Sequence, residues 1–166
     1  MKIAIVSGKD EGPTKLNAFD NALSDGGIGD VNLIKVSSML AGNTKIEPLP
    51  KLKAGAMVNC VLSEVTSDNP GDEITAVIAV AIGEPLGCVV ETSGINENPD
   101  ELIDNAKEMV IYMMNKRDVE IKDLIIESST TIVKNTASVI SSVVYLNDEI
   151  IEEKKWMHEI NKLRQI

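Results

Sequence analysis

Three positions in this chain of 166 residues carry side chains that acid–base or nucleophilic chemistry could use. Asp20 follows Leu16 by four residues, which places it at the edge of the apolar stripe of an expected helix, where a carboxylate needs a partner or lines a cleft. Glu91 ends the apolar run Cys88-Val89-Val90, and a carboxyl emerging from a buried strand is desolvated, as a general acid requires. The pair Ser37-Ser38 closes an expected strand and offers a hydroxyl nucleophile.

Each of these positions also has an ordinary structural explanation. Asp20 could be a boundary residue that reaches water, and Glu91 could turn into solvent at the end of its strand. Two serines often lead from a strand into a polar loop. From the residue types alone, the catalytic and the structural interpretation both stay open.

Other patterns that often mark catalytic or cofactor sites have ordinary explanations here. Gly26-Gly27-Ile28-Gly29 follows an expected helix and precedes an expected strand, the reverse of the order in a dinucleotide-binding turn. Ser7-Gly8-Lys9 lacks the first glycine and the spacing of a P-loop. The single histidine, His158, lies in a polar tail, so we expect no histidine-based triad and no metal site. Methionines 109, 113 and 114 are assigned to core packing.

The composition argues against several classes of protein. A net charge of −10 and an aromatic content of 2% provide neither the basic stripe nor the stacking platforms of a nucleic-acid-binding protein. The longest apolar run, Ile74–Ile82, is less than half of the ~20 residues that a membrane-spanning helix needs. Cys60 and Cys88 lie in apolar runs without CxxC spacing, which is typical of reduced core thiols. We therefore expect one soluble, cytoplasmic domain over residues 1–166 that binds neither nucleic acid nor membrane.

Two helices are expected from their start and stop signals. Thr14 should begin the first, which Gly26-Gly27 would end. Asn98-Pro99 should begin the second, which runs to Arg117. The predicted buried faces are Leu16, Phe19 and Leu23 in the first helix, and Leu102, Ala106, Met109 and Met113 in the second.

Strands account for most of the remaining chain. We expect them over residues 2–7, 31–37, 56–66, 73–82, 87–92, 119–127 and 137–145, with an irregular connection over 40–55. The polar cluster Ser67–Asp72 predicts a hairpin between the third and fourth strands, and the charged segment 147–166 predicts an extra C-terminal helix. Because strands mostly follow one another, the predicted fold class is α+β, with antiparallel sheet covered by two or three helices.

The order and spacing of the chemical residues resemble the pyruvoyl-dependent arginine decarboxylases. The resemblance is strongest over Leu16–Leu23 and Gly27–Ser38, and the second stretch ends at the serine pair that this family cleaves. Further matches follow in order at Pro48-Leu49-Pro50-Lys51-Leu52, Gly55-Ala56, Pro70-Gly71 and Val89-Val90-Glu91. A chance serine pair would not carry this context.

The resemblance implies a four-layer αββα sandwich of mainly antiparallel sheet, made as a proenzyme. The hydroxyl of Ser38 would attack the carbonyl of Ser37, and autocatalytic cleavage would give a β chain of residues 1–37 and an α chain of residues 38–166. Ser38 would become a covalently bound pyruvoyl group, the cofactor in place of pyridoxal phosphate or a metal. That group would form a Schiff base with L-arginine, and loss of CO2 would yield agmatine.

The resemblance also implies roles for individual side chains. Glu91 matches the residue that delivers a proton after CO2 is lost, and Asn32 matches a residue linked to processing and to the site around the pyruvoyl group. Asp20 matches the residue that holds the guanidinium, which a carboxylate can grip with two parallel hydrogen bonds. Leu16, Gly29 and Val31 match backbone or packing positions around the bound arginine.

The spacing of these residues favours a site shared between subunits. In a regular strand Asn32 and Ser38 would lie about 20 Å apart, at ~3.3 Å per residue, which is too far to contact one substrate. We therefore expect Asp20 and Asn32 from one subunit to meet Ser38 and Glu91 from the next. The homotrimer of the resembled family has this property.

Two alternatives keep the fold and change the function. A pyruvoyl-dependent decarboxylase of another basic amino acid would differ in what Asp20 holds. A non-processed, non-catalytic oligomeric homologue would never cleave at Ser37-Ser38. The loop Thr92-Ser93-Gly94 departs from the family pattern, which leaves the fine-tuning of substrate choice open.

Overall fold

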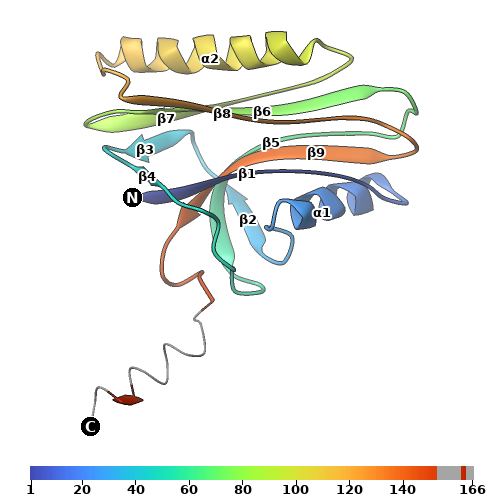
Figure 1. The fold of residues 1–166 in the computed structure, drawn as a ribbon, viewed down its shortest axis with the longest axis horizontal. Coiled ribbons are helices and arrows are strands. Elements are labelled where there is room, and N and C mark those ends of the chain that lie inside the picture. The colour runs from blue at the N-terminus through green and yellow to red at the C-terminus, as the bar shows by residue number, and fades with distance from the viewer. Residues whose placement is uncertain (153–161, 164–166) are drawn as a thin grey trace.

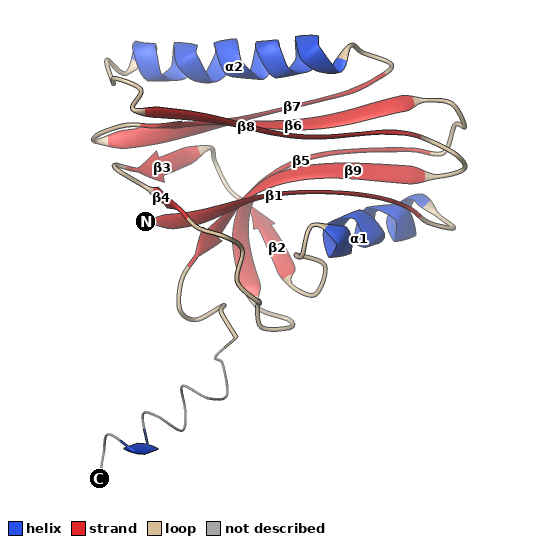
Figure 2. Ribbon diagram, viewed as in Figure 1, coloured by secondary structure: helices blue, strands red, loops and turns tan. Residues whose placement is uncertain are grey.

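The computed structural model describes residues 1–152 and 162–163. Its elements stack in four layers, with α1 on a five-stranded sheet, a four-stranded sheet behind it, and α2 on the outside of the second sheet (Figure 1). The two sheets lie face to face in the middle of the molecule (Figure 2). The predicted α+β class and the αββα sandwich are both confirmed.

Sheet A, the five-stranded sheet, has the order β2-β5-β9-β1-β4, and sheet B has the order β3-β7-β6-β8. The helices are α1 (Lys15–Asp25) and α2 (Pro99–Lys116). The strands are β1 (Lys2–Glu11), β2 (Asn32–Lys35), β3 (Met39–Ala41), β4 (Lys45–Ile46), β5 (Met57–Ser67), β6 (Glu73–Ile82), β7 (Leu86–Ile95), β8 (Asp123–Ile132) and β9 (Ala137–Leu146). Among the described strands, the pairs β1–β4 and β2–β5 are parallel and the other pairs are antiparallel.

Both helices begin at the predicted capping residues. The Thr14 side chain accepts a hydrogen bond from the N–H of Asn17, and the Asn98 side chain accepts one from the N–H of Asp100. At the other end of α1, Gly27 has a φ of 81°, a conformation that glycine adopts without strain. The sequence therefore locates these helix ends correctly.

The buried face of each helix is rotated from the predicted one. In α1 the buried residues are Ala18, Ala22 and Leu23, whereas Leu16 is 75% exposed. In α2 the buried residues are Leu102, Ala106, Val110 and Met114. These four form one i, i+4 row, so Met109 turns to solvent and is 49% exposed. The assignment of Met109 to the core is wrong, while Met113 and Met114 do pack against it.

The predicted hairpin at Ser67–Asp72 is also wrong. The turn is present, but β5 belongs to sheet A and β6 to sheet B, so the chain crosses between the sheets. The carboxylate of Asp72 holds this crossing by accepting hydrogen bonds from Ser67 at 2.6 Å and from Asn69 and Asn96 at 2.9 Å. Both strands have apolar inward faces. These faces are buried equally well when the two strands lie in opposite sheets and when they are neighbours in one sheet that packs against the other.

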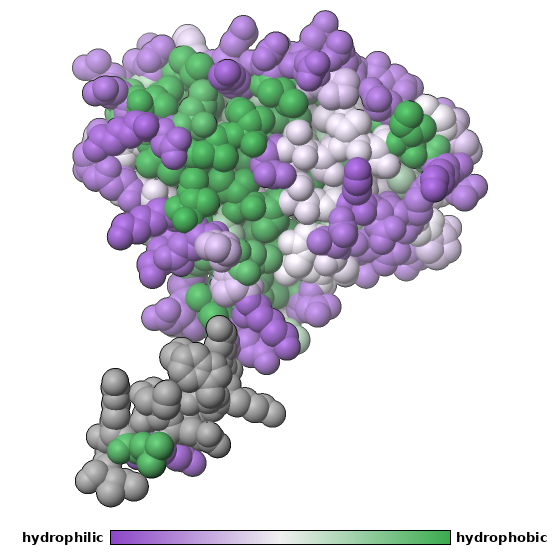
Figure 3. Space-filling view, in the orientation of Figure 1, coloured by the Kyte–Doolittle hydropathy of each residue, from purple (hydrophilic) through white to green (hydrophobic). Residues whose placement is uncertain are grey.

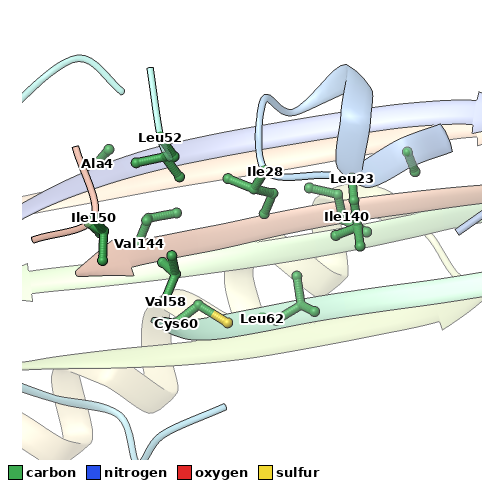
Figure 4. Packing of buried hydrophobic residues seen from close by; sticks show 11 residues of the cluster. Ala4, Leu23, Ile28, Leu52, Val58, Cys60, Leu62, Ile140, Val144 and Ile150 are labelled. Carbon is green, nitrogen blue, oxygen red and sulfur yellow. The ribbon is translucent and has the colours of Figure 1, made fainter. Parts of the chain in front are cut away.

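Strand β1 continues past the residues predicted to break it. Gly8 lies inside the strand, where a Cβ would come within 2.2 Å of the Ala22 carbonyl oxygen and 2.7 Å of the Gly26 nitrogen. This glycine therefore allows α1 to pack closely on β1. The apolar side chains beneath α1, including Leu23, Ile28 and Ile140, are packed on sheet A (Figure 4).

The C-terminal segment does not begin with the predicted helix. Residues 148–150 form a turn, and Ile151 makes an isolated bridge with Leu52. The rest of the helix predicted over 147–166, His158 included, lies outside the described residues except for 162–163. Within the part of the chain that the structure describes, no helix is long and apolar enough to cross a membrane.

Candidate active site

The pair Ser37-Ser38 lies where the chain crosses from sheet A to sheet B. The strand predicted over residues 31–37 is divided here, because β2 ends and β3 begins in the other sheet. On the side of sheet A, the N–H of Val36 donates to the Cys60 carbonyl at 3.0 Å. On the side of sheet B, the carbonyl of the second serine accepts from the N–H of Val89 at 2.9 Å. The peptide bond between the serines therefore spans two anchored ends.

The residue after the pair is held as well. The hydroxyl of Tyr145, on β9 of sheet A, donates to the Met39 carbonyl at 2.8 Å. Burial raises the pKa of the Tyr145 hydroxyl above its ordinary value, so it remains a donor throughout the neutral range. The N–H of Met39 donates to the carbonyl oxygen of Ser37 at 2.9 Å. Sequence reasoning missed Tyr145, because a tyrosine near the end of an apolar strand gives no signal of its partner.

Glu91 lies on β7, the strand beside β3. It shares a face with Val89, opposite Cys88 and Val90, as strand alternation predicts. Its side chain is exposed, however, so the expectation of a desolvated carboxyl is wrong for the single chain. The reason is that β3 pairs with β7 only over Leu86–Cys88, which leaves the edge of β7 open from there on.

The register places Glu91 on the side of the peptide bond between Ser37 and Ser38. Ser38 is bonded to Val89, and the chain before Ser38 runs in the direction of Glu91 because β3 and β7 are antiparallel. Glu91 lies two residues beyond Val89, about 7 Å along the strand. One chain therefore places Ser38, directly before β3, next to the strand that carries Glu91.

The remaining candidates belong to the segment that runs from α1 into β2. Leu16 and Asp20, one helical turn apart, lie on the exposed face of α1. Gly29 allows the following loop to pass close to the last turn of the helix, since a Cβ there would come within 2.8 Å of the Ser24 Cα. We call this segment, residues 15–35, the α1–β2 unit.

Val31 and Asn32 complete the α1–β2 unit at its strand. Val31 is half-buried and packs against the apolar cluster beneath α1. The side-chain amide of Asn32 donates to the Gly55 carbonyl at 3.0 Å, and its backbone N–H donates to the Ala56 carbonyl at 2.8 Å. The single chain thus assembles two groups of candidates, one at β3 and β7 and one along the α1–β2 unit. Asn32 begins β2, and the serine pair lies beyond the other end of this strand.

The two cysteines are structural. Cys60 and Cys88 are free and buried, and burial raises the pKa of both thiols. Raised thiol pKa values disfavour the reactive thiolate at neutral pH. The prediction of core thiols is confirmed.

The comparisons with known proteins decide the family. The family model described as "Pyruvoyl-dependent arginine decarboxylase (PvlArgDC)" matches residues 2–150 of the chain. The chain belongs to this family. A pyruvoyl-dependent arginine decarboxylase of Methanothermobacter thermautotrophicus is 54% identical over 147 residues, which cover 89% of this chain and 97% of the relative. A protein of the same name from Pyrococcus furiosus is 33% identical over 150 residues, covering 86% of this chain and 93% of the relative.

A solved structure entitled pyruvoyl-dependent histidine decarboxylase at pH 8 matches with a TM-score of 0.47 and 17% identity, covering 61% of this chain and 55% of that one. Membership in the pyruvoyl-dependent arginine decarboxylase family confirms the predicted resemblance over nearly the whole described chain. It also confirms the predicted class of enzyme, a decarboxylase, and the predicted cofactor, a pyruvoyl group.

Proposed function

We propose that this family member activates itself by cleavage between Ser37 and Ser38 and then converts L-arginine to agmatine and CO2. The observation that carries the proposal is the position of the serine pair, which is anchored to both sheets and has Glu91 on the adjacent strand. The names of the relatives support arginine as the substrate.

The cleavage chemistry needs only groups of the chain and one water molecule. The Oγ of Ser38 forms a bond to the carbonyl carbon of Ser37 and the C–N bond breaks, with the Oγ proton passing to the nitrogen. Loss of the Cα proton of Ser38 then expels the Ser37 carboxylate by breaking the Cβ–Oγ bond. Water replaces the nitrogen of the remaining enamine, in its imine form, and releases ammonia, leaving a ketone at position 38. No oxidant or reductant is consumed.

The surroundings of Ser38 fit a pyruvoyl group at that position. The carbonyl that would form its amide end is already bonded to the N–H of Val89, and Ser38 is half-buried. Residues 1–37 would stay bound after cleavage, because β1 pairs with β9 along its whole length, from Lys2–Leu146 to Glu11–Ala137. The new α chain would begin at β3 in sheet B.

The ketone of a pyruvoyl group condenses with a primary amine and accepts the electron pair that remains when CO2 leaves. The chain supplies binding and proton transfer around it. Glu91 would hold the proton that is delivered to the substrate's α carbon. Asp20 would accept two hydrogen bonds from the guanidinium, with Leu16, Gly29 and Val31 around the substrate. Asn32, fixed through Gly55, would contribute to processing and to the site around Ser38.

We further propose a homotrimer in which each active site forms between two subunits. Ile34 and Val36, just before the serine pair in sequence, are exposed apolar residues, and Met57, which pairs with Asn32 at the other end of β2, is 62% exposed. Apolar residues also gather over one end of the sandwich, where β3, β4 and the start of β1 lie (Figure 3). A neighbouring subunit would cover such surface, desolvate Glu91, and supply the Asp20 and Asn32 that the single chain leaves apart.

Free thiols and the absence of disulfide pairing between Cys60 and Cys88 agree with a cytoplasmic enzyme.

Intact mass spectrometry of the denatured protein tests the cleavage. We expect two species, residues 1–37 and a 38–166 chain that is about 17 Da lighter than one beginning with serine. Under native conditions the two should remain in one particle. A single species of 166 residues that persists through long incubation would contradict self-activation and support the non-processed alternative.

The release of CO2 from labelled amino acids tests the substrate. L-arginine should be decarboxylated, and L-lysine and L-ornithine should react far more slowly because their ammonium groups cannot form two parallel hydrogen bonds with Asp20. Faster release from either of the latter would favour another basic amino acid as the substrate.

Combining two impaired variants tests the shared site. Chains carrying Asp20→Asn and chains carrying Glu91→Gln are co-expressed in equal amounts, so that residues 1–37 and 38–166 of each chain stay paired through β1 and β9 when trimers assemble. Assayed at arginine well below the parent KM, the mixture should show about a quarter of the parent activity, since that share of inter-subunit sites receives both intact residues. Activity no higher than the sum of the separate variants would place both residues in one protomer or disprove their roles.

A further inference from the structure

One hydrogen bond at the serine pair belongs to neither sheet. The N–H of Met39 donates to the carbonyl oxygen of Ser37 at 2.9 Å, which closes a three-residue γ-turn centred on Ser38. Positive φ values at non-glycine positions of the described chain occur at Asn43, Asn96 and Asp118, so φ at Ser38 is negative and the turn is of the relaxed, inverse type. The oxygen that accepts this bond is the one on the carbonyl that Ser38 would attack.

The strand register leaves this N–H free of the ladder. Met39 is paired with Cys88, and the neighbouring ladder bond runs from the N–H of Val89 to the carbonyl of Ser38. In an antiparallel ladder this pattern makes Met39 and Cys88 a non-hydrogen-bonded pair, whose N–H and C=O groups point away from each other's strands. The carbonyl of Met39 accepts from Tyr145 instead, and its N–H turns to Ser37.

We propose that the backbone N–H of Met39 is the oxyanion donor for self-cleavage, a proposal that rests on the cleavage at Ser37-Ser38 proposed above. When the Oγ of Ser38 adds to the carbonyl carbon of Ser37, an electron pair moves onto the carbonyl oxygen, which becomes negative. The N–H of Met39 already lies 2.9 Å from that atom and stabilises the charge without reorganisation. The pair returns to the carbon as the C–N bond breaks and the nitrogen takes the proton from Oγ.

The anchors of the segment keep this donor in place. The carbonyl of Ser38 is bonded to Val89 and the carbonyl of Met39 to Tyr145, so the N–H cannot turn away without breaking these bonds. On the other side of the scissile bond, Val36 is bonded to Cys60. This fixed geometry supplies the donor before the reaction starts, which is where such groups are most effective.

The test removes the N–H and keeps the side chain. In an otherwise unchanged full-length chain made by semisynthesis, the hydroxy-acid analogue of methionine at position 39 replaces the N–H with an oxygen. A second ester, at Ala41, whose N–H faces the Met1 sulfur, controls for the effect of ester chemistry on β3. Met39→Pro also lacks the N–H and spares the ladder bonds, and Met39→Leu keeps the N–H and changes only the side chain.

The rate at which the full-length chain disappears is followed by intact mass, together with circular dichroism and native mass. We expect cleavage to slow by about 10²- to 10³-fold in the Met39 ester and in Met39→Pro, the usual effect of losing one oxyanion donor. The Ala41 ester and Met39→Leu should cleave within about threefold of the parent rate. The uncleaved Met39 variants should also show no hydroxylamine cut after residue 37, where an accumulated ester between the serines would lie, because the defect precedes that ester. In the Met39 ester, hydroxylamine cuts the engineered linkage after residue 38, and fragment mass distinguishes the two sites.

The outcomes distinguish the proposed oxyanion donor from the self-cleavage on which that proposal rests. If Met39→Pro does not fold, the Met39 ester decides the question. A folded Met39 ester that is cleaved at the parent rate overturns the oxyanion proposal alone, as does accumulation in it of an ester between Ser37 and Ser38, recognised by a hydroxylamine cut after residue 37. A parent chain that is never cleaved overturns both.

Discussion

The region around Ser38 and the α1–β2 unit differ in how completely a single chain builds them. Around Ser38, bonds from Cys60, Val89 and Tyr145 fix the backbone from both sheets. In the α1–β2 unit, the helix is well packed beneath but presents Leu16 and Asp20 to solvent. The first region is held in place by its own chain, whereas the second presents exposed side chains at Leu16 and Asp20.

The bond proposed to be cleaved, between Ser37 and Ser38, is the boundary between these two regions. Cleavage would leave the α1–β2 unit wholly within residues 1–37, and β3 and β7 wholly within residues 38–166. The region around Ser38 would act within its own chain, and its backbone is fixed before subunits assemble. The α1–β2 unit would act on the substrate of a neighbouring subunit, so its side chains can remain exposed until assembly. This comparison leads to four predictions.

The largest effect should follow Ser38→Ala. Without the hydroxyl there is no nucleophile and no leaving group, so we expect no cleavage by intact mass and no CO2 release from arginine above background. Ser37→Ala is the matched control, because the reaction uses only the backbone carbonyl of Ser37, and it should still yield both fragments. Cleavage of the Ser38→Ala chain at this bond would mean that another group is the nucleophile.

Glu91→Gln should separate processing from decarboxylation. We expect both fragments to form, while kcat for arginine decarboxylation falls about 10²- to 10⁴-fold because a proton donor is lost. Glu97→Gln, at an exposed glutamate just beyond β7, should keep the parent kcat. A processed Glu91→Gln enzyme with normal kcat would remove Glu91 from the chemistry.

Asp20→Asn should affect binding and spare cleavage. The loss of a charge-assisted pair with the guanidinium should raise KM for arginine about 10- to 100-fold, with both fragments formed at the parent rate. Asp104→Asn, on the exposed surface of α2, is the matched control and should leave KM unchanged. Unaltered arginine binding by the Asp20→Asn variant would disprove the proposal that Asp20 binds the guanidinium group.

The smallest effect should be that of Leu16→Ala on the stability of the folded chain. Leu16 is 75% exposed, so we expect its removal to change the free energy of unfolding by less than ~0.5 kcal/mol. Leu23→Ala, on the same helix but buried on sheet A, should destabilise by about 2–4 kcal/mol. Chemical denaturation of the Ser38→Ala background, which stays intact, measures both. Equal losses would place Leu16 in the core of its own chain.

Local signals of the sequence were sufficient for the helix ends and for most strands. Thr14 and Asn98 act as caps because their side chains bond to backbone groups two or three residues away, which is a matter of spacing alone. The spaced matches from Leu16 to Glu91 likewise indicate the family, because the order of residues is itself the signal.

Tertiary structure decided which sheet each strand joins and which residues lie at an edge. Nothing between Ser67 and Asp72 distinguishes a hairpin from a crossing between sheets, because both bury the same apolar faces. Glu91 is exposed because β3 is short, and Leu16 because alanines of the same helix face the sheet. These outcomes depend on partners far away in the chain.

The sequence by itself determined the chemical groups, their order and the local elements that carry them. The three-dimensional structure decided that the serine pair bridges two sheets, that Tyr145 and Val89 hold it, and that the N–H of Met39 faces the Ser37 carbonyl. The physical reason is that propensities and caps act over a few residues, whereas hydrogen-bond partners across strands are fixed only when distant segments pack together.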